Sequence, residues 1–327
     1  MKLLIIRFSS IGDLTQALSI SSFVKSYVPQ AEIHFITRSD LAPLLQNHPN
    51  INLTWSLDKT SGFLGLLKII SKLREENFTH IYDAHNNLRS ALIRLLLWKP
   101  KKVVRPMMRL KRFLLIQFHY NLFEKPFSGQ RDLIKPLENW NFKFFLPTAP
   151  QLFLNKEAIQ FSEDIIKQNH LLNFTVLVPS ATYDLKRWPI EYWQKLVVLN
   201  PEKQFVVLAG PTDEFTSELS KNKNVCNLTG KTSLLQSAAI IQKSCAVVSN
   251  DTGLLHIAEQ LGKPTIALMG PAPFGFPSRA TTTILERDLN CRPCSKHGQG
   301  PCRNPIFQEC LRSITAEEVS QKLASLL

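Results

Sequence analysis

The chain has 327 residues, of which 44% are hydrophobic and 20% are charged. This length favours two domains of about 100 to 200 residues each, and the composition excludes a disordered or fibrous protein. No apolar run approaches the roughly 18 to 20 residues of a membrane span, and the N-terminus lacks the pattern of a secretory signal, so we expect a cytoplasmic protein.

The net charge of +13 is unevenly distributed along the chain. Residues 1–150 hold 21 Lys and Arg against 10 Asp and Glu, which places +11 of that charge in the first half. Seven of these cations, interleaved with apolar residues and no acid, lie in residues 99–112, which we call the basic run. Such a run is typical of a solvated surface, a nucleic-acid site or a surface for anionic lipid headgroups. A nucleic-acid recognition motif is absent, which disfavours the second interpretation.

Strand-like apolar runs alternate with helical segments in two series. The first series predicts strands at residues 3–8, 33–37, 80–83 and 102–105. The second predicts strands at residues 174–178, 205–209, 225–228, 246–249 and 265–269. Because near-continuous apolar strands joined by helices form parallel sheets covered on both faces, the fold class is α/β with two Rossmann-like domains.

The predicted domain boundary lies at a proline-containing linker, residues 146–150. We expect one domain at residues 1–155, a second at residues 165–312, and a C-terminal helix at residues 313–327 that packs back on the first domain. That helix opens with a capping box of Thr315 and Glu318. Ligands of such folds bind at the carboxyl ends of the strands, so the active site is expected in a central cleft between the domains.

The turn after the first strand, residues 7–14, carries Asp13 next to Gly12. It is not a G-x-G-x-x-G fingerprint, which disfavours a nicotinamide dehydrogenase. Asp13 is interpreted either as a cap or dipole partner of the following helix, or as a general base.

Residues 249–256 follow a strand of the second series and open a helix. The free N–H groups and positive dipole of such a helix N-terminus suit a diphosphate, although Asp251 or Thr252 could serve only as a cap. Lys186 and Arg187 stand at the end of another strand of the same sheet. Phosphate-binding groups therefore converge on one edge of the predicted second domain.

These segments together resemble glycosyltransferase family 9, the ADP-heptose:lipopolysaccharide heptosyltransferases. The likeness covers most of the chain, and its motifs fall in the family's order. They are S-x-x-G-D at residues 9–13, the segment 83–89, K-R-W-P at residues 186–189, the segment 227–234 and D-T-G-x-x-H at residues 251–256.

The resemblance implies a GT-B fold and an inverting, metal-independent transfer of heptose from ADP-L-glycero-D-manno-heptose to the Kdo-lipid A core or its heptosylated product. Asp13 would be the catalytic base and Lys186 would bind the donor phosphates. The expected donor-binding residues are Ser180, Lys186, Glu214, Asp251, Thr252, Gly253, Leu254 and His256. The expected acceptor-binding residues are Ser10, Gly12, Arg89, Lys101, Lys102 and Arg105.

An anionic acceptor of this kind would place the protein at the inner face of the cytoplasmic membrane as a peripheral protein, with no nucleic-acid partner. Two alternatives remain: a related glycosyltransferase that uses another nucleotide sugar, and a non-catalytic relative that binds an anionic ligand. The presence of both Asp13 and Lys186 disfavours the second alternative.

Four of the six cysteines are spaced C-x2-C-x7-C-x7-C. The first spacing is typical of a structural zinc site, while disulfides and free thiols are the other interpretations. No cofactor is expected to be required for catalysis. The four residues are Cys291, Cys294, Cys302 and Cys310.

Overall fold

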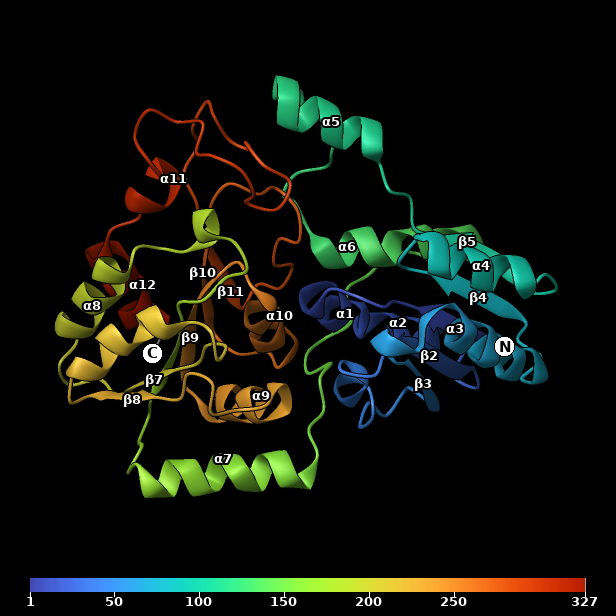
Figure 1. Ribbon diagram of the computed structural model, residues 1–327, viewed down its shortest axis with the longest axis horizontal. Helices are drawn as coiled ribbons and strands as arrows, with labels where there is room; N and C mark the ends of the chain where they lie inside the picture. The colour runs from blue at the N-terminus through green and yellow to red at the C-terminus, as the bar shows by residue number, and fades with distance from the viewer. Residues whose placement is uncertain (327) are drawn as a thin grey trace. The chain divides into compact units, whose positions relative to one another are not determined.

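The computed structural model describes residues 1–326 and divides into two compact units (Figure 1). The first unit comprises Met1–Met108 and Gly129–Phe153. The second comprises Arg109–Ser128 and the chain from Leu154 onward. The division thus passes next to the predicted linker, but Arg109–Ser128, which the sequence placed in the first domain, belongs with the second unit.

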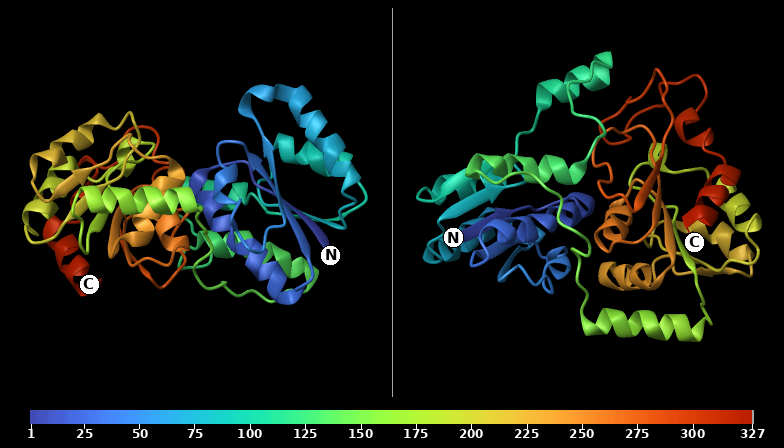
Figure 2. Two further views of the ribbon diagram at one scale, coloured as in Figure 1. Left: turned by 90° about the horizontal axis from the view of Figure 1, so that it is seen from below. Right: turned by 180° about the vertical axis from the view of Figure 1, so that it is seen from behind.

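The first unit is built on a five-stranded parallel sheet of strand order β3-β2-β1-β4-β5. One face is covered by α1, α2 and α6, and the other by α3 and α4 (Figure 2). The strands are β1 (Lys2–Ile6), β2 (Glu32–Arg38), β3 (Leu53–Leu57), β4 (His80–Asp83) and β5 (Lys101–Val104). The helices are α1 (Ile11–Ala17), α2 (Ser19–Tyr27), α3 (Gly62–Glu75), α4 (Leu88–Leu96) and α6 (Gly129–Ile134).

Side chains of β1 alternate between these two faces, as a strand requires. Leu4 and Ile6 pack into the core beneath α3 and α4, and all of β1 from Leu3 to Ile6 is fully buried. The sequence missed β3, because this edge strand is only partly covered and has no continuous apolar run: Leu53 is 42% exposed.

The second unit is built on a six-stranded parallel sheet of strand order β11-β10-β9-β6-β7-β8. α8 and α12 lie on one face, and α9 and α10 on the other, with α7 packed on α9 (Figure 1). The strands are β6 (Thr175–Val178), β7 (Phe205–Val207), β8 (Val225–Asn227), β9 (Ala246–Asn250), β10 (Thr265–Leu268) and β11 (Thr282–Leu285). The helices are α7 (Lys156–Gln168), α8 (Ile190–Val198), α9 (Leu234–Lys243), α10 (Gly253–Gln260) and α12 (Ala316–Leu326).

The two sheets confirm the predicted pair of Rossmann-like domains. Each strand expected from the sequence is present, with ends shifted by at most two residues, and only β3 and β11 were missed.

The C-terminal helix α12 belongs to the core of the second unit. It packs against α8 and β10 within the second unit, where Val319 and Leu323 join the core around Trp193. Its apolar face therefore helps to cover the sheet of the second unit. The predicted cap is half formed: Thr315 Oγ1 accepts a hydrogen bond from Glu318 N at 3.2 Å, while the Glu318 carboxylate pairs with Arg287.

The excursion Arg109–Ser128 contains α5 (Arg109–Phe118) and packs on the loop after β10. The Arg112 guanidinium lies over the Phe274 ring at 4.6 Å, and Phe123 packs edge-on against the same ring. The basic run is therefore divided between the two units at Met108. No helix within residues 1–326 combines the length and apolar character needed to cross a membrane.

Candidate functional site

In the first unit, Asp13 lies in the first turn of α1, directly after the carboxyl end of β1. Ser10 is the N-cap residue, in an extended conformation, but its hydroxyl does not cap the helix. The hydroxyl instead donates a hydrogen bond to Asp13 Oδ2 at 3.0 Å. The Asp13 side chain remains 33% exposed, so a ligand can reach its carboxylate.

Arg7 fixes the position of this carboxylate. Its buried guanidinium lies 2.5 Å from Asp13 Oδ2 and also donates hydrogen bonds to Ser9 O and Ala84 O, each at 2.6 Å. The Arg7 guanidinium therefore connects the β1–α1 turn to the end of β4, because its several N–H groups can donate hydrogen bonds in different directions.

The pKa of Asp13 is lowered from 3.8 to about 2. Burial opposes ionisation, but it is outweighed by the positive charges of Arg7 and Arg105 and by hydrogen bonds from Ser10. Asp13 is thus a carboxylate at neutral pH, able to accept a proton and unable to donate one.

Two residues of the segment 83–89, Asp83 and His85, have structural roles. Asp83 is fully buried, accepts hydrogen bonds from the N–H groups of His85 and Asn86 and pairs with Arg94 at 2.8 Å. His85 Nδ1 accepts from Phe8 N at 3.3 Å, and burial together with the charge of Arg7 lowers the pKa of His85 to about 4. His85 is therefore neutral at pH 7.

The expected acceptor residues do not form one cluster. Arg105 follows the carboxyl end of β5, and its positive charge helps to lower the pKa of Asp13. Lys101 and Lys102 lie at the start of the same strand. Four strand residues span about 13 Å, so these two lysines lie toward the amino ends of the strands, away from Asp13. Arg89 is exposed in the first turn of α4, and Gly12 is half-buried in α1.

In the second unit, Lys186 and Asp251 form an ion pair with Nζ and Oδ2 2.5 Å apart, and both side chains are largely buried. Asp251 precedes α10, whose N-cap residue Thr252 is extended and makes no side-chain capping bond. The first-turn N–H groups of α10 are consequently left for another acceptor, at the positive end of the helix dipole. A basic group and a helix N-terminus thus stand together, as expected from the sequence.

Asn250 is a positioning residue that the sequence reasoning missed. It ends β9 fully buried, donates to Pro179 O at 2.7 Å and accepts from Trp188 N at 3.1 Å. These bonds hold both ends of the loop that carries Lys186. An asparagine at the end of a buried strand, directly before Asp251, is the signal that could have revealed it.

Arg187 connects the Lys186 loop to the loop after β7. It donates to Ala181 O and pairs with Asp184 at 2.8 Å and with Asp213 at 3.5 Å. Asp213 also accepts from Gly210 N at 2.9 Å, so it closes the turn. The neighbouring Glu214, predicted to hold the nucleotide, is exposed.

The remaining predicted donor residues differ in exposure. Ser180, Gly253 and Leu254 are half-buried, whereas His256 is only 4% exposed, one turn into α10. His256 Nδ1 lies 3.5 Å from a carboxylate oxygen of the fully buried Glu259. His256 therefore lies beneath the N-terminal turn rather than on its surface.

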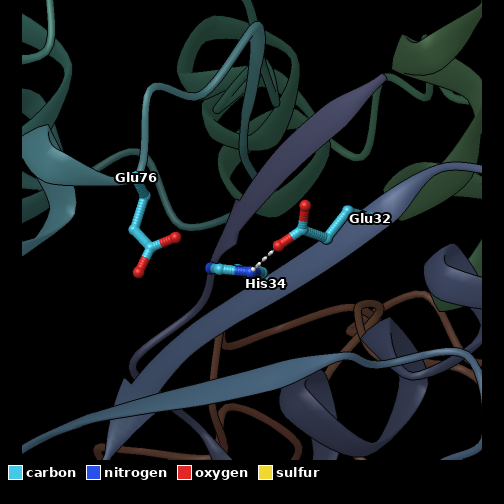
Figure 3. Close-up of side chains that lie close together, drawn as sticks. All are labelled: Glu32, His34 and Glu76. Atoms are coloured by element: carbon cyan, nitrogen blue, oxygen red, sulfur yellow. Dashed lines mark hydrogen bonds and ion pairs between the residues drawn. The ribbon is translucent and has the colours of Figure 1, made fainter.

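A metal-like group of side chains in the first unit is better explained as an ion-pair network (Figure 3). His34 Nε2 contacts Glu32 at 2.8 Å, and His34 Nδ1 accepts from Trp55 Nε1 at 3.1 Å, so both ring nitrogens are engaged. The Lys2 ammonium binds Glu32 at 3.1 Å and Glu76 at 2.6 Å, which already supplies their counter-charge. The group also lies at the amino ends of β1 and β2, away from Asp13.

All six cysteines are free thiols, so the disulfide interpretation is wrong. Burial raises the pKa of Cys310 to about 11 and that of Cys294 above its ordinary value. These thiols are therefore protonated at neutral pH unless a cation stabilises the thiolates.

The chain is similar to a known family of proteins and to several of its members. The family model described as glycosyltransferase family 9 (heptosyltransferase) matches residues 66–301. The chain is 28% identical to lipooligosaccharide heptosyltransferase 2 of Haemophilus influenzae, over all of this chain and 99% of that protein.

Solved structures share the fold. The structure of Escherichia coli ADP-heptose lipopolysaccharide heptosyltransferase II has a TM-score of 0.76 at 23% identity, covering 100% of this chain and 98% of that one. A glycosyltransferase family 9 protein from Veillonella parvula has a TM-score of 0.82 at 18% identity, covering 99% and 96%. These likenesses confirm the predicted GT-B type of fold.

Proposed function

Because this chain belongs to glycosyltransferase family 9, the heptosyltransferase family, we propose that it transfers heptose from ADP-heptose to the inner core of lipopolysaccharide. The names of its relatives support this acceptor, since they are heptosyltransferases of lipopolysaccharide or lipooligosaccharide that cover the whole chain. The name of the similar Escherichia coli structure, ADP-heptose lipopolysaccharide heptosyltransferase II, supports the donor. The observation that carries the proposal is the Lys186–Asp251 pair at the uncapped N-terminus of α10.

In this proposal, Lys186 and the first-turn N–H groups of α10 bind the diphosphate of the donor. Negative charge grows on that diphosphate as the bond to the anomeric carbon breaks. A fixed ammonium and a helix dipole stabilise this charge most strongly where water is largely excluded, and Lys186 is only 14% exposed. Catalysis then needs no metal ion at the departing group.

Asp13 is the proposed base of an inverting transfer. The acceptor hydroxyl gives its proton to the carboxylate while its oxygen attacks the anomeric carbon and ADP departs. Arg7 and the Ser10 hydroxyl both contact Oδ2, so we assign the proton to Oδ1. Arg7 holds the carboxylate in place and Arg105 adds positive charge for the phosphates and carboxylates of the acceptor.

We further propose that the first unit contacts the membrane surface. Exposed apolar side chains lie among cations on α3, on α4 and just after α4: Leu64 is 72%, Leu95 71% and Trp98 72% exposed. Leu95 and Trp98 line an open groove of about 370 Å³ with Ala91, Arg94 and Lys102. Apolar side chains flanked by cations are the pattern of proteins that bind anionic lipid surfaces.

The test is incubation of the purified protein with ADP-heptose and truncated lipid A cores, followed by mass measurement of the acceptor. A mass gain of one heptose that is suppressed by added ADP is the expected result. The absence of transfer to Kdo-bearing or heptosylated cores, or stronger competition by UDP than by ADP, would refute the assignment.

A further inference from the structure

The loop after β11 and the short helix α11 (Glu309–Arg312) bring four cysteines around one small cavity. Cys291, Cys294, Cys302 and Cys310 all line this enclosed space of about 10 Å³. Cys294 and Cys310 are buried, at 9% and 8% exposure. Four thiols from one 20-residue segment, gathered around one small space, form a donor set suited to a soft divalent metal.

Hydrogen-bond donors point at the sulfur atoms. The N–H of Gln308 donates to Cys302 Sγ at 3.3 Å, and Asn304 Nδ2 donates to Cys291 Sγ at 3.4 Å. Such N–H contacts stabilise negative charge on sulfur and orient it, as the outer groups around metal-bound thiolates do. A purely apolar cluster of thiols would not require them.

The sulfur atoms are not yet at coordination distance. Among residues 1–326, only Glu32, His34 and Glu76 place three ligand atoms within 4.8 Å of one another. A tetrahedral zinc ion with bonds of about 2.3 Å would bring its sulfur atoms to about 3.8 Å. Binding must therefore contract the loop, and Gly298 and Gly300, both with positive φ, provide the backbone freedom for it.

The same segment contacts Lys186 and the turn that carries it. Gln308 Nε2 donates to Asp184 O at 2.7 Å and to Arg187 O at 3.4 Å, so Gln308 binds the backbone on both sides of Lys186. The backbone of Gly298 also lies against the Lys186 side chain, because a Cβ there would stand 2.8 Å from Lys186 Cγ. Gln308 thus links Cys302, through its N–H, directly to the Lys186 turn.

We propose that Cys291, Cys294, Cys302 and Cys310 bind one zinc ion as four thiolates, and that the zinc-bound loop holds Lys186 in position. Binding releases the thiol protons, so zinc affinity falls as the pH is lowered. The zinc ion is structural and takes no part in the transfer. Only the link to Lys186 rests on the donor role proposed above.

The first test measures metal in the full-length protein by elemental analysis. We expect about one equivalent of zinc, its loss in Cys294→Ser, and its retention in the matched control Cys245→Ser, which lies outside the cluster. Treating the unaltered protein with a chelator should lower the melting temperature, and added zinc should restore it. Iron in place of zinc, no metal, or equal metal in both variants would overturn the site.

The second test separates the site from its effect on the donor. Gln308→Ala removes the bridge while keeping all four cysteines, so zinc content should stay at one equivalent while the Kd for ADP rises about two- to tenfold. Chelation should raise the Kd similarly. An unchanged Kd in both experiments would overturn the positioning of Lys186, whereas zinc binding without any ADP binding would instead refute the proposed donor function.

Discussion

At the scale of single residues, Asp13 is the strongest test of the chemistry. Asp13→Asn keeps the shape of the side chain but removes its basicity. We expect kcat to fall by about 10² to 10⁴ while the Kd for ADP stays nearly unchanged. The melting temperature should also fall, because Arg7 is left buried without its counter-charge.

A control variant distinguishes the base from a residue that only closes the first helical turn. Ser10→Ala removes one hydrogen bond to the same carboxylate and should reduce kcat by less than about tenfold. If Asp13→Asn retained near-normal turnover per folded molecule, Asp13 would be assigned to the turn alone.

Arg7 sets the pH range over which the base works. Because the pKa of Asp13 is lowered to about 2, the carboxylate is lost only as the pH falls through that value. The profile of kcat/KM should therefore show no acid limb from Asp13 between pH 5 and pH 8. The stability that the ion pair contributes is likewise present above the ordinary pKa of 3.8 and is lost toward pH 2.

Replacing Arg7 makes this prediction measurable. Arg7→Met removes the largest influence that favours ionisation, so the pKa of Asp13 should rise and the acid limb should move to higher pH. Arg7→Lys keeps the charge and should leave the limb nearer its original place. Identical pH profiles for the two variants would contradict the electrostatic role of Arg7.

At the scale of elements, the N-terminus of α10 and Lys186 should act as a unit. We expect Lys186→Ala to weaken ADP binding by roughly 10- to 100-fold, and Asp251→Ala to weaken it less, since that change keeps the ammonium and removes only the carboxylate that holds it in position. The double variant should lose little more than Lys186→Ala alone. Calorimetric titration with ADP gives the three values, and additive losses would show that the two residues act independently.

The strand β5 separates two kinds of cation. Arg105→Ser, at its carboxyl end, should raise the acceptor KM more than the donor KM and weaken the salt dependence of acceptor binding. Lys101→Ser, at its amino end, is the matched control and should change neither substantially. Equal effects of the two substitutions on the acceptor KM would contradict this difference and would indicate that both ends of β5 bind the acceptor.

At the scale of the whole molecule, the exposed apolar side chains of α3 and α4 predict binding to lipid surfaces. The protein should cosediment with vesicles that contain phosphatidylglycerol, less so at high salt. Leu95→Glu should reduce this binding, whereas Leu172→Glu, at an equally exposed leucine of the second unit, should not. Equal loss in both variants would argue against a defined contact face.

The sequence by itself determined the two parallel sheets, the order of the motifs and the positions of Asp13, Lys186 and α10. These features are local: the buried parts of strands such as β1 and β9 are apolar runs, LLII and AVV, and turn and helix-start residues follow these strands. The edge strand β3 was not predicted, because its side chains are only partly buried and it lacks that pattern. The sequence therefore predicted those features that a single segment specifies without contacts to the rest of the chain.

Only the tertiary structure decided which distant residues meet. The bond from Arg7 to Ala84, the joining of Pro179 and Trp188 by Asn250, and the packing of α12 in the second unit all depend on contacts between segments far apart in sequence. The basic run shows the converse, because neighbours in sequence are divided between two units. Register and packing, which no local pattern specifies, fix these contacts.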